Sequence, residues 1–359
     1  MGGSILGKEI QLITFGESHG VAMGGVIEGF PSGVKIDYDL ISRELVRRKP
    51  AGDFFATKRV EPDDFEILSG VFEGKSLGTP IAFIVRNKQH NPSEYSSLQH
   101  NYRPSHADYT WQQKFGLRDL RGGGRASARE TVSRVFGGAF AKMLLKTAGI
   151  SLYAYVSAIG EVSIANPNPN YRIEDIESAP LRCPDKEAEG KMMKALKRAS
   201  DDGDTLGGVI TCIIENCPTG LGEPVFDKLE SDLAHAIMSI PSVKGFEIGS
   251  GFHGATMRGS AHNDPFVSDD GKIRTAKNDA GGVLGGISSG EKIVFRTAFK
   301  PVSSIHKEQK TVDENAKQTV ITINGRHDIC VVPRAVVIVE AMAALVLADH
   351  LQRNKLARM

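Results

Sequence analysis

The chain has 359 residues, of which 40% are hydrophobic and 24% charged, as in an ordinary soluble globular protein. Its 44 Lys and Arg residues balance 43 Asp and Glu residues, so the formal net charge is +1, which speaks against a general nucleic-acid binder. The N-terminal segment lacks a basic region and a long apolar stretch, so we expect no signal peptide, and no apolar run is long enough to predict a membrane span.

Periodic apolar residues predict the main elements in chain order. A first helix ends near Pro50, and a second begins at Ser127, which fits a capping box with Glu130. Further helices are predicted over residues 224–240 and 334–353, the last being apolar nearly all round and therefore central. Strand-like runs occupy residues 10–15, 81–86, 209–214, 292–299 and 319–323.

A weak internal repeat relates the two ends of the chain. The segment GGVIEGFPSG (24–33) resembles GGVITCIIENCPTG (207–220), and FEILSGVFEG (65–74) resembles FEIGSGFHG (246–254). The second copies follow the first at offsets of 183 and 181 residues. Matching order and offset predict a duplication that gives two similar β-α-β halves.

The strands occur in groups between helices and not in strict alternation with them. This grouping favours an α+β fold, a layered sandwich with long central helices between antiparallel sheets. Two polar segments, 166–190 and 310–319, are predicted to be surface connections. Because no flexible linker is visible, we predict one domain over residues 1–359, with similar halves at roughly 1–150 and 200–359.

The four cysteines show no zinc-type spacing, and the chain has neither an H-E-x-x-H motif nor a carboxylate cluster. We therefore predict reduced, buried thiols in a cytosolic protein and no metal site.

The segment RDLRGGGRASARET (118–131) combines four arginines with three consecutive glycines. Glycine lets the backbone approach a ligand closely, and arginine matches phosphate or carboxylate oxygens. The helix predicted to start at Ser127 adds free N–H groups at its positive end. The pattern is neither a Walker A loop nor a dinucleotide fingerprint, and a solvated helix face is the alternative interpretation.

Two histidines lie in polar, turn-like segments. His19 lies in TFGESHG (14–20), where we expect it to be more exposed than a core histidine, and His106 lies in RPSHADYT (103–110). Either could be a general acid or base near neutral pH, and either could instead be a structural turn or capping histidine.

Four further segments are rich in glycine, hydroxyl or basic residues: 43–50, 278–291, 300–305 and 324–335. Together with the arginine-glycine segment they exceed what one phosphate requires. They indicate a polyanionic substrate, with an anionic cofactor beside it.

Taken together, TFGESHG, RPSHADYT, GLRDLRGGGRASARET, GLGEPVFDKL, NDAGGVLGGISSG and GRHDICVVPRA resemble the chorismate synthase family, bacterial type, from about residue 16 to residue 351. The resemblance implies a lyase of aromatic amino acid biosynthesis, the shikimate pathway. Such an enzyme converts 5-enolpyruvylshikimate 3-phosphate to chorismate and phosphate by 1,4-anti elimination and requires reduced FMN. It also implies a layered sandwich with an internal pseudo-twofold, a homotetramer and a cytoplasmic location, with no nucleic-acid or membrane partner.

The resemblance assigns roles to individual residues. His19 would donate a proton to the departing phosphate, and His106 would tune the protonation of the flavin. Asp328, with Ser18 and Ser127, would assist proton transfer near the flavin N5. The flavin contacts would be Arg125, Ala126, Ser127, Pro241, Ser242, Gly285, Lys300, Pro301, Val302, Ser303, Ser304 and Arg326. The substrate contacts would be Ser18, His19, Arg48, Arg134 and Arg334.

The sequence departs from the family pattern at a few positions. Ala126 stands where Ser is common and Pro241 where Asn is common, and both can still offer backbone contacts. Phe54 stands where an Arg is common, which puts a phosphate or nucleotide contact there in question, and Ile329 and Val337 replace prolines. No dinucleotide fingerprint is visible, so we expect an external flavin reductant, while the sequence leaves open whether the enzyme also reduces its flavin with NADPH. The alternatives are a phosphate lyase or transferase without flavin and an RNA-binding module.

Overall fold

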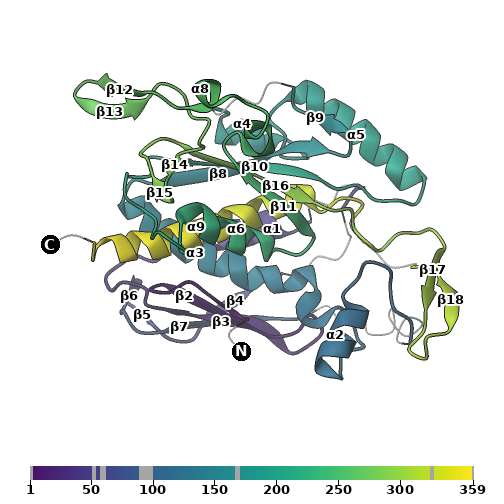
Figure 1. Cartoon of the computed structure of the whole chain (residues 1–359). Coiled ribbons are helices and arrows are strands. Elements are labelled where there is room, and N and C mark those ends of the chain that lie inside the picture. Colours follow the sequence, from purple (N-terminus) through teal and green to yellow (C-terminus); the bar gives the residue numbers. More distant parts are fainter. Residues whose placement is uncertain are drawn as a thin grey trace.

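The computed structural model describes residues 3–50, 54–56, 62–88, 100–165, 170–323 and 327–357. In this part of the chain two five-stranded antiparallel sheets lie on either side of a layer of long helices (Figure 1). The predicted α+β sandwich with central helices is confirmed.

The first sheet has the strand order β1-β2-β3-β7-β4. In the last but one of these strands Ile81, Phe83 and Val85 are buried, because alternate side chains of a strand face the same side. Phe83 stacks on Phe136 of the central helix α3 (Thr131–Thr147), with 3.8 Å between ring centroids. The strands are β1 (Ile5–Leu6), β2 (Gln11–Phe15), β3 (Ala22–Glu28), β4 (Phe65–Ile67) and β7 (Ile81–Arg86).

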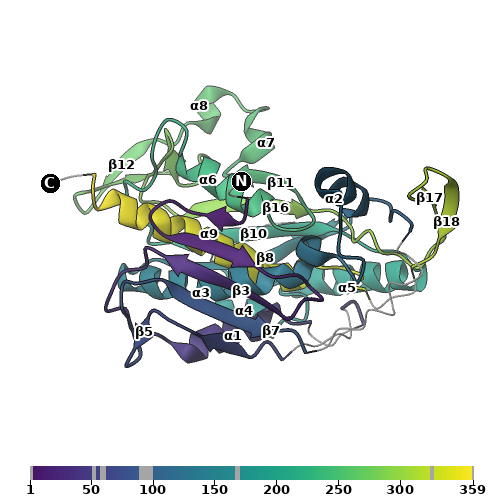
Figure 2. The ribbon, with the colours of Figure 1, turned by 90° about the horizontal axis from the view of Figure 1, so that it is seen from below.

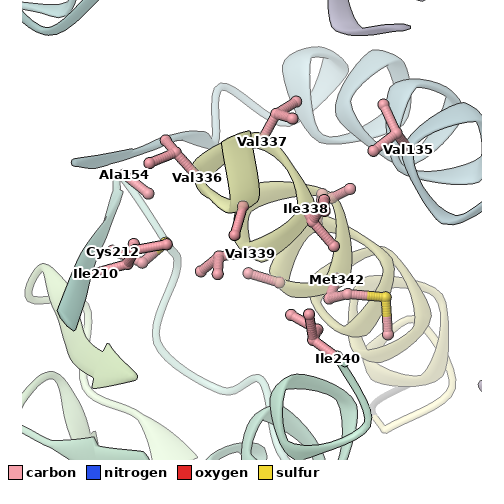
Figure 3. Packing of buried hydrophobic residues seen from close by; sticks show 14 of the residues in the cluster. Val135, Ala154, Ile210, Cys212, Ile240, Val336, Val337, Ile338, Val339 and Met342 are labelled. Carbon is pink, nitrogen blue, oxygen red and sulfur yellow. The ribbon is translucent and has the colours of Figure 1, made fainter. Parts of the chain in front are cut away.

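The second sheet has the order β11-β16-β10-β8-β9. Its inner face packs on the central helix α9 (Val332–Asn354), and Figure 3 shows Ile210 and Cys212 of the sheet close to Val336 and Val339 of that helix. The strands are β8 (Ser151–Ile159), β9 (Val162–Ser163), β10 (Gly208–Glu215), β11 (Val243–Ile248) and β16 (Ile293–Phe299).

Helices α3 and α9 form the centre of the molecule and lie between the two sheets (Figures 1 and 2). Nearly the whole length of α9 is buried, as its apolar sequence predicted. The two helices approach closely at Gly138, where a Cβ would lie 2.3 Å from the Cβ of Ala341. Two shorter helices, α1 (Tyr38–Arg48) and α6 (Leu229–Met238), complete this layer.

The two halves use the same order of elements. In each half two strands are followed by a helix, two further sheet strands and a long central helix: β2, β3, α1, β4, β7, α3 and β8, β10, α6, β11, β16, α9. The spatial orders β2-β3-β7-β4 and β8-β10-β16-β11 correspond as well. This correspondence is what the pseudo-twofold arrangement requires.

The remaining helices and strands lie outside the two large sheets and the central helical layer. The helices are α2 (Asp108–Phe115), α4 (Ile173–Ser178), α5 (Lys186–Asp201), α7 (Gly251–Gly254) and α8 (Gly259–His262). The short hairpins are β5 (Val71–Phe72) with β6 (Lys75–Ser76), β12 (Phe266–Asp269) with β13 (Lys272–Thr275), β14 (Val283–Leu284) with β15 (Ile287–Ser288), and β17 (Gln309–Val312) with β18 (Gln318–Ile321).

Three predictions about local structure need correction. The helix expected over 224–240 begins only at Leu229, after a loop. The polar segment 310–319 forms most of the β17–β18 hairpin and is not a plain connection. Within 166–190 lie α4 and the start of α5, because Ile176 and Cys183 are buried and anchor the segment.

A buried ionic cluster joins the helical layer to the second sheet. Glu340 on α9 is 2% exposed and accepts hydrogen bonds from Arg47 (2.7 Å), from Lys142 (2.6 Å) and from the backbone N–H of Ala154 (3.0 Å). Burial by itself would raise the pKa of Glu340, but the charges of Arg47 and Lys142 hold it well below its ordinary value. The carboxylate is therefore ionised in the folded protein at neutral pH.

All four cysteines are free and buried, as predicted. Burial raises the pKa of Cys330 to about 12, so its thiol stays protonated. Among the helices of the described ranges, none is both long and apolar enough to cross a bilayer.

Candidate active site

The turn after β2 holds Ser18 and His19 below the protein surface. His19 is only 4% exposed, so the expectation of a comparatively exposed turn histidine is wrong. Ser18 is fully buried, and its Oγ lies 2.9 Å from Nδ1 of the His19 ring. The glycine-bounded turn is thus covered by other segments, and the imidazole is fixed from one side by a hydroxyl.

Asn87, just beyond β7, holds this turn in place. Its side-chain amide donates to the carbonyls of Glu17 (3.1 Å) and Gly20 (2.9 Å). Its Oδ1 accepts a 3.0 Å hydrogen bond from Nε of Arg129. One amide side chain therefore connects the histidine turn to the segment that precedes α3.

The triple-glycine loop covers the histidine. A Cβ on Gly122 would lie 2.4 Å from both Cε1 and Nδ1 of His19, closer than real Cβ contacts allow. The carbonyl of Gly124 faces the backbone N–H of Ser18 at 3.4 Å. The loop needs glycine here because its backbone lies directly against the imidazole ring.

The entry to α3 differs from the predicted capping box. Residues Gly124–Ala126 and Ala128–Glu130 form two 3₁₀ turns before the helix. Ser127 caps the second turn, since its Oγ accepts from the backbone N–H of Arg129 at 3.3 Å. The Glu130 carboxylate does not return to Ser127 but pairs with Arg134 at 2.8 Å.

Arg125 points from this loop toward β2. Its guanidinium donates to Oγ1 of Thr14 at 2.7 Å and to the carbonyl of Gly16 at 3.4 Å. This places a fixed positive charge at the end of the strand that leads to His19.

A buried carboxylate, that of Asp63, forms ion pairs with two arginines. Asp63 pairs with Arg48 at 2.6 Å and also with Arg129. Burial would raise the pKa of Asp63, but the two guanidinium charges lower it below its ordinary value. Nε of Arg48 and Nη2 of Arg129 are buried and have no hydrogen-bond partner among the described residues.

Arg334 and Asp328 belong to the same neighbourhood. They form an ion pair at 3.1 Å just before and within the first turn of α9. Burial, followed by the positive charges of Arg334 and Arg129, lowers the pKa of Arg48. Three arginines against the two carboxylates of Asp63 and Asp328 leave an excess of positive charge, which favours binding of an anion.

His106 lies in a second loop, ahead of α2. Its Nδ1 is 2.9 Å from Oδ1 of Asp108, and Lys300 donates to the carbonyl of Ser105 at 2.9 Å. Ser105 adopts the left-handed conformation with φ = 57°, which turns the chain so that His106 faces the cleft described below.

The predicted cofactor segments 241–242 and 300–304 lie together. The backbone N–H of Lys300 donates to the carbonyl of Ser242 at 2.9 Å, and Thr205 donates to the carbonyl of Val302 at 2.7 Å. Pro241, Ser242 and Ser303 are half-buried, Ser304 is buried and Pro301 is exposed. The Lys300 bond to Ser105 links this pair of segments to the His106 loop.

A cleft of about 610 Å³ separates α2 from the glycine loop. Its size is in the range of sites for small molecules and cofactors. One wall is apolar and includes Trp111, the single tryptophan of the chain. The lining residues are Glu17, His106, Ala107, Asp108, Trp111, Phe115, Leu117, Arg118, Asp119, Leu120, Arg121, Gly122, Gly123, Gly124, Arg125 and Ala126.

Gly285 and Arg134 are not gathered with the other predicted site residues, and the placement of one more is not described. Gly285 lies in the β14–β15 turn, on the opposite side of the molecule from α2 (Figure 1). Arg134 is engaged by Glu130 and by Oγ of Ser239 at 2.7 Å. Arg326 falls outside the described residues.

Sequence reasoning missed Asp63, Asn87 and Arg129 as parts of this site. Asp63 lies in a stretch without a motif, and Asn87 follows a strand by one residue. Arg129 belongs to the quoted arginine-glycine segment, where its spacing alone gave no reason to separate it from its neighbours. Only the tertiary contacts distinguish these residues.

Comparison with known proteins identifies the family of the chain. A family model described as chorismate synthase matches residues 10–352. A chorismate synthase of Phocaeicola vulgatus is 50% identical over 344 residues, 96% of each chain. One of Prochlorococcus marinus strain MIT 9211 is 52% identical over 356 residues, 98% of each chain.

The fold agrees as well. A solved structure described as the crystal structure of chorismate synthase superposes with a TM-score of 0.77 at 32% identity, over 97% of this chain and 92% of that one. Sequence and fold match over nearly the entire length, and the chain is therefore an enzyme of the chorismate synthase family.

Proposed function

We propose that this enzyme converts 5-enolpyruvylshikimate 3-phosphate to chorismate and phosphate by a 1,4-anti elimination that requires reduced FMN. The reaction breaks a ring C–H bond and the C–O bond to phosphate and involves no net oxidation. The observation that carries the proposal is the packing of the His19 ring against Gly122, beside Arg125, because it joins a proton donor to an anion-binding loop. Membership of the family favours this reaction over a flavin-free phosphate enzyme or an RNA-binding module.

The arginines supply the charge that the substrate requires. The substrate carries one phosphate and two carboxylates, and we assign their recognition to Arg48 and Arg334, with Arg134 as a further predicted contact. A buried donor without a partner costs about 1–3 kcal/mol, so the free N–H groups of Arg48 and Arg129 favour an incoming anion. The free-energy cost of leaving these donors without a partner is then offset when the substrate binds.

His19 is assigned the proton that the departing phosphate needs. The Ser18 hydroxyl holds Nδ1 of the ring and fixes its direction. A positioned imidazole of this kind contributes about 10²–10⁴-fold as a general acid. The neighbouring N–H groups of the glycine loop would stabilise the negative charge that develops on the leaving group.

The residues present fit a flavin phosphate. The 610 Å³ cleft has an apolar wall for a planar ring system and positive groups for a phosphate. When bound, reduced FMN would supply electron density and a basic N5 for the ring proton. His106 would set the proton balance at the flavin, and Asp328, Ser18 and Ser127 would assist proton movement near it. The chain would hold the group through Arg125, Ala126, Ser127, Pro241, Ser242, Gly285, Lys300, Pro301, Val302, Ser303, Ser304 and Arg326.

We further infer a homotetramer in the cytoplasm, supplied with reduced flavin by an external reductant. Support for assembly comes from the β12–β13 hairpin, where Phe266 and Ile273 are 67% and 77% exposed. Isolated two-stranded hairpins are marginal in water, so a partner surface would stabilise this one. Gly285, far from the cleft in its own chain, fits the proposal only if assembly brings it to another subunit's site.

The direct test is anaerobic turnover. The protein is mixed with chemically reduced FMN and 5-enolpyruvylshikimate 3-phosphate, and both chorismate and phosphate are followed. We expect stoichiometric release of the two products, with FMN still reduced at the end. Phosphate without chorismate, or flavin binding without turnover, would show that the assigned chemistry is wrong.

Gly122→Ala tests the proposed site in a protein that should still fold. The new methyl group would meet the His19 ring at 2.4 Å and displace it, and a misplacement near 1 Å costs about 10²-fold in rate. The expected result is a loss of kcat of that size, with a loss of stability of about 1–3 kcal/mol, the usual cost of overpacking a buried contact.

The matched control for this variant is Gly190→Ala. This glycine lies within α5 with open space around it, so alanine should keep full activity and raise stability by up to ~1 kcal/mol. If Gly122→Ala kept full activity, the contact between Gly122 and His19 would not be part of the proposed site.

A further inference from the structure

Asp108, the first residue of α2, has a carboxylate held by two arginines. It is 4% exposed and accepts from Nε and Nη2 of Arg103, both at 2.7 Å, and it forms an ion pair with Arg118 at 3.0 Å. Burial would raise the pKa of Asp108, but the hydrogen bonds from Arg103 and His106 lower it well below its ordinary value. The group is therefore an ionised carboxylate that can only accept hydrogen bonds.

The ring of His106 meets this carboxylate at one nitrogen. Nδ1 lies 2.9 Å from Oδ1 of Asp108, and a carboxylate that only accepts requires a hydrogen on that nitrogen. Nη2 of Arg103 also lies 3.0 Å from Nδ1, and of its two N–H groups one donates to the same Oδ1. The contact between Nδ1 and the carboxylate oxygen is shorter, at 2.9 Å, and involves a charged acceptor, so it favours hydrogen on Nδ1 over a lone pair that would accept from Arg103. In the neutral ring the lone pair is then on Nε2.

The surrounding charges reinforce this arrangement. Arg118 and Asp108 both line the cleft, as His106 does. Lys300 fixes the carbonyl of the preceding residue, Ser105, from a distant strand end. The ring is thus anchored at Nδ1 and by its backbone, while about a fifth of its side chain remains exposed.

We propose that Asp108 is the positioning residue of His106: it fixes the tautomer with hydrogen on Nδ1 and offers Nε2 to the cleft as a proton acceptor. The functional meaning rests on the proposed function, because the cleft is where the flavin is assigned. In that setting Nε2 takes or returns one proton while Nδ1–H stays bonded to Asp108, and the carboxylate itself does not change its protonation. An imidazole with an undefined tautomer would present the wrong nitrogen in part of the molecules.

The tautomer can be measured without cofactor or substrate. Long-range ¹H–¹⁵N spectra of the unliganded, histidine-labelled protein distinguish protonated from unprotonated ring nitrogens, and His106→Gln identifies the His106 signals by their loss. At a pH where the ring is neutral, we expect hydrogen on Nδ1 and a lone pair on Nε2. Hydrogen on Nε2 in the unaltered protein would overturn the proposal, whatever any variant does.

Asp108→Asn tests the cause. The asparagine amide can donate to Nδ1, so we expect the Nε2–H form to gain population. Arg118→Lys is the control, because it alters the ion pair of Asp108 but leaves the carboxylate against His106. An unchanged tautomer in Asp108→Asn, or the same change in Arg118→Lys, contradicts the assignment to the Asp108 carboxylate.

Kinetics then connect the tautomer to turnover. Partners that orient a metal-bound imidazole are worth about 10–100-fold, and we expect the same range for His106, so Asp108→Asn should lower kcat by that factor with an unchanged KM for substrate. Asp108→Glu should recover part of the loss. A fall in KM and kcat together in a protein with the native tautomer would indicate a merely structural role. If the unaltered protein shows no turnover, the proposed function fails while the tautomer result stands.

Discussion

Replacing His19 or His106 by alanine is expected to lower kcat by about 10²–10⁴-fold, the range for loss of a positioned acid–base group. His19 lies against the glycine loop and on Ser18, and His106 faces the cleft from its bond to Asp108. His106 lines the cleft, whereas His19 packs against Gly122, so the two losses of activity should have different causes. Anaerobic turnover with reduced FMN measures them.

The control for both variants is His253→Ala, since this exposed residue of α7 does not line the cleft and its replacement should keep full activity. Thermal unfolding of each variant shows whether a loss reflects unfolding. If a correctly folded His19→Ala or His106→Ala retains near-native turnover, that residue loses its assigned role.

Glu340→Gln is expected to reduce the free energy of unfolding by about 3–5 kcal/mol. Removing one carboxylate of a buried ionic cluster leaves an excess of positive charge, here on Arg47 and Lys142, which then share Glu44, with Glu177 as a further partner of Arg47. Glutamine keeps the volume and can still accept from the backbone N–H of Ala154, so the change isolates the charge. Urea unfolding at neutral pH gives the value.

The comparison for this variant is Glu187→Gln on α5. Glu187 forms an exposed pair with Lys191 one helical turn away, and such pairs contribute under about 0.5 kcal/mol. A loss at Glu340 as small as the one at Glu187 would mean that the cluster does not stabilise the fold.

The same carboxylate predicts a pH dependence. The pKa of Glu340 is lower in the folded protein than its ordinary value of 4.5, so the folded state binds the proton less readily than the unfolded state. Its stabilising contribution is therefore complete above about pH 4.5 and is lost as the pH falls below that value. Glu340→Gln should show a shallower loss of stability in this acid range, and an equally steep loss would exclude Glu340 as a source.

Many of the strands and helices follow from local sequence patterns. Alternating and periodic apolar residues predicted the strands at 81–86 and 209–214 and the central helix, because burial of one face is encoded within a few residues. The polar segments were harder. A single buried side chain such as Ile176 is enough to anchor a helix that composition assigns to a loop.

Local patterns in the sequence predicted the sandwich of sheets around apolar helices and the two histidine segments with their glycine-rich, basic surroundings. The tertiary structure alone decided that Gly122 touches His19, that Asn87 ties the turn to Arg129, and that Asp63 gathers its two arginines. Local patterns depend on neighbours a few residues apart. Each of these contacts joins segments 15 to more than 100 residues apart, so its partners are fixed only when the sheets and helices pack.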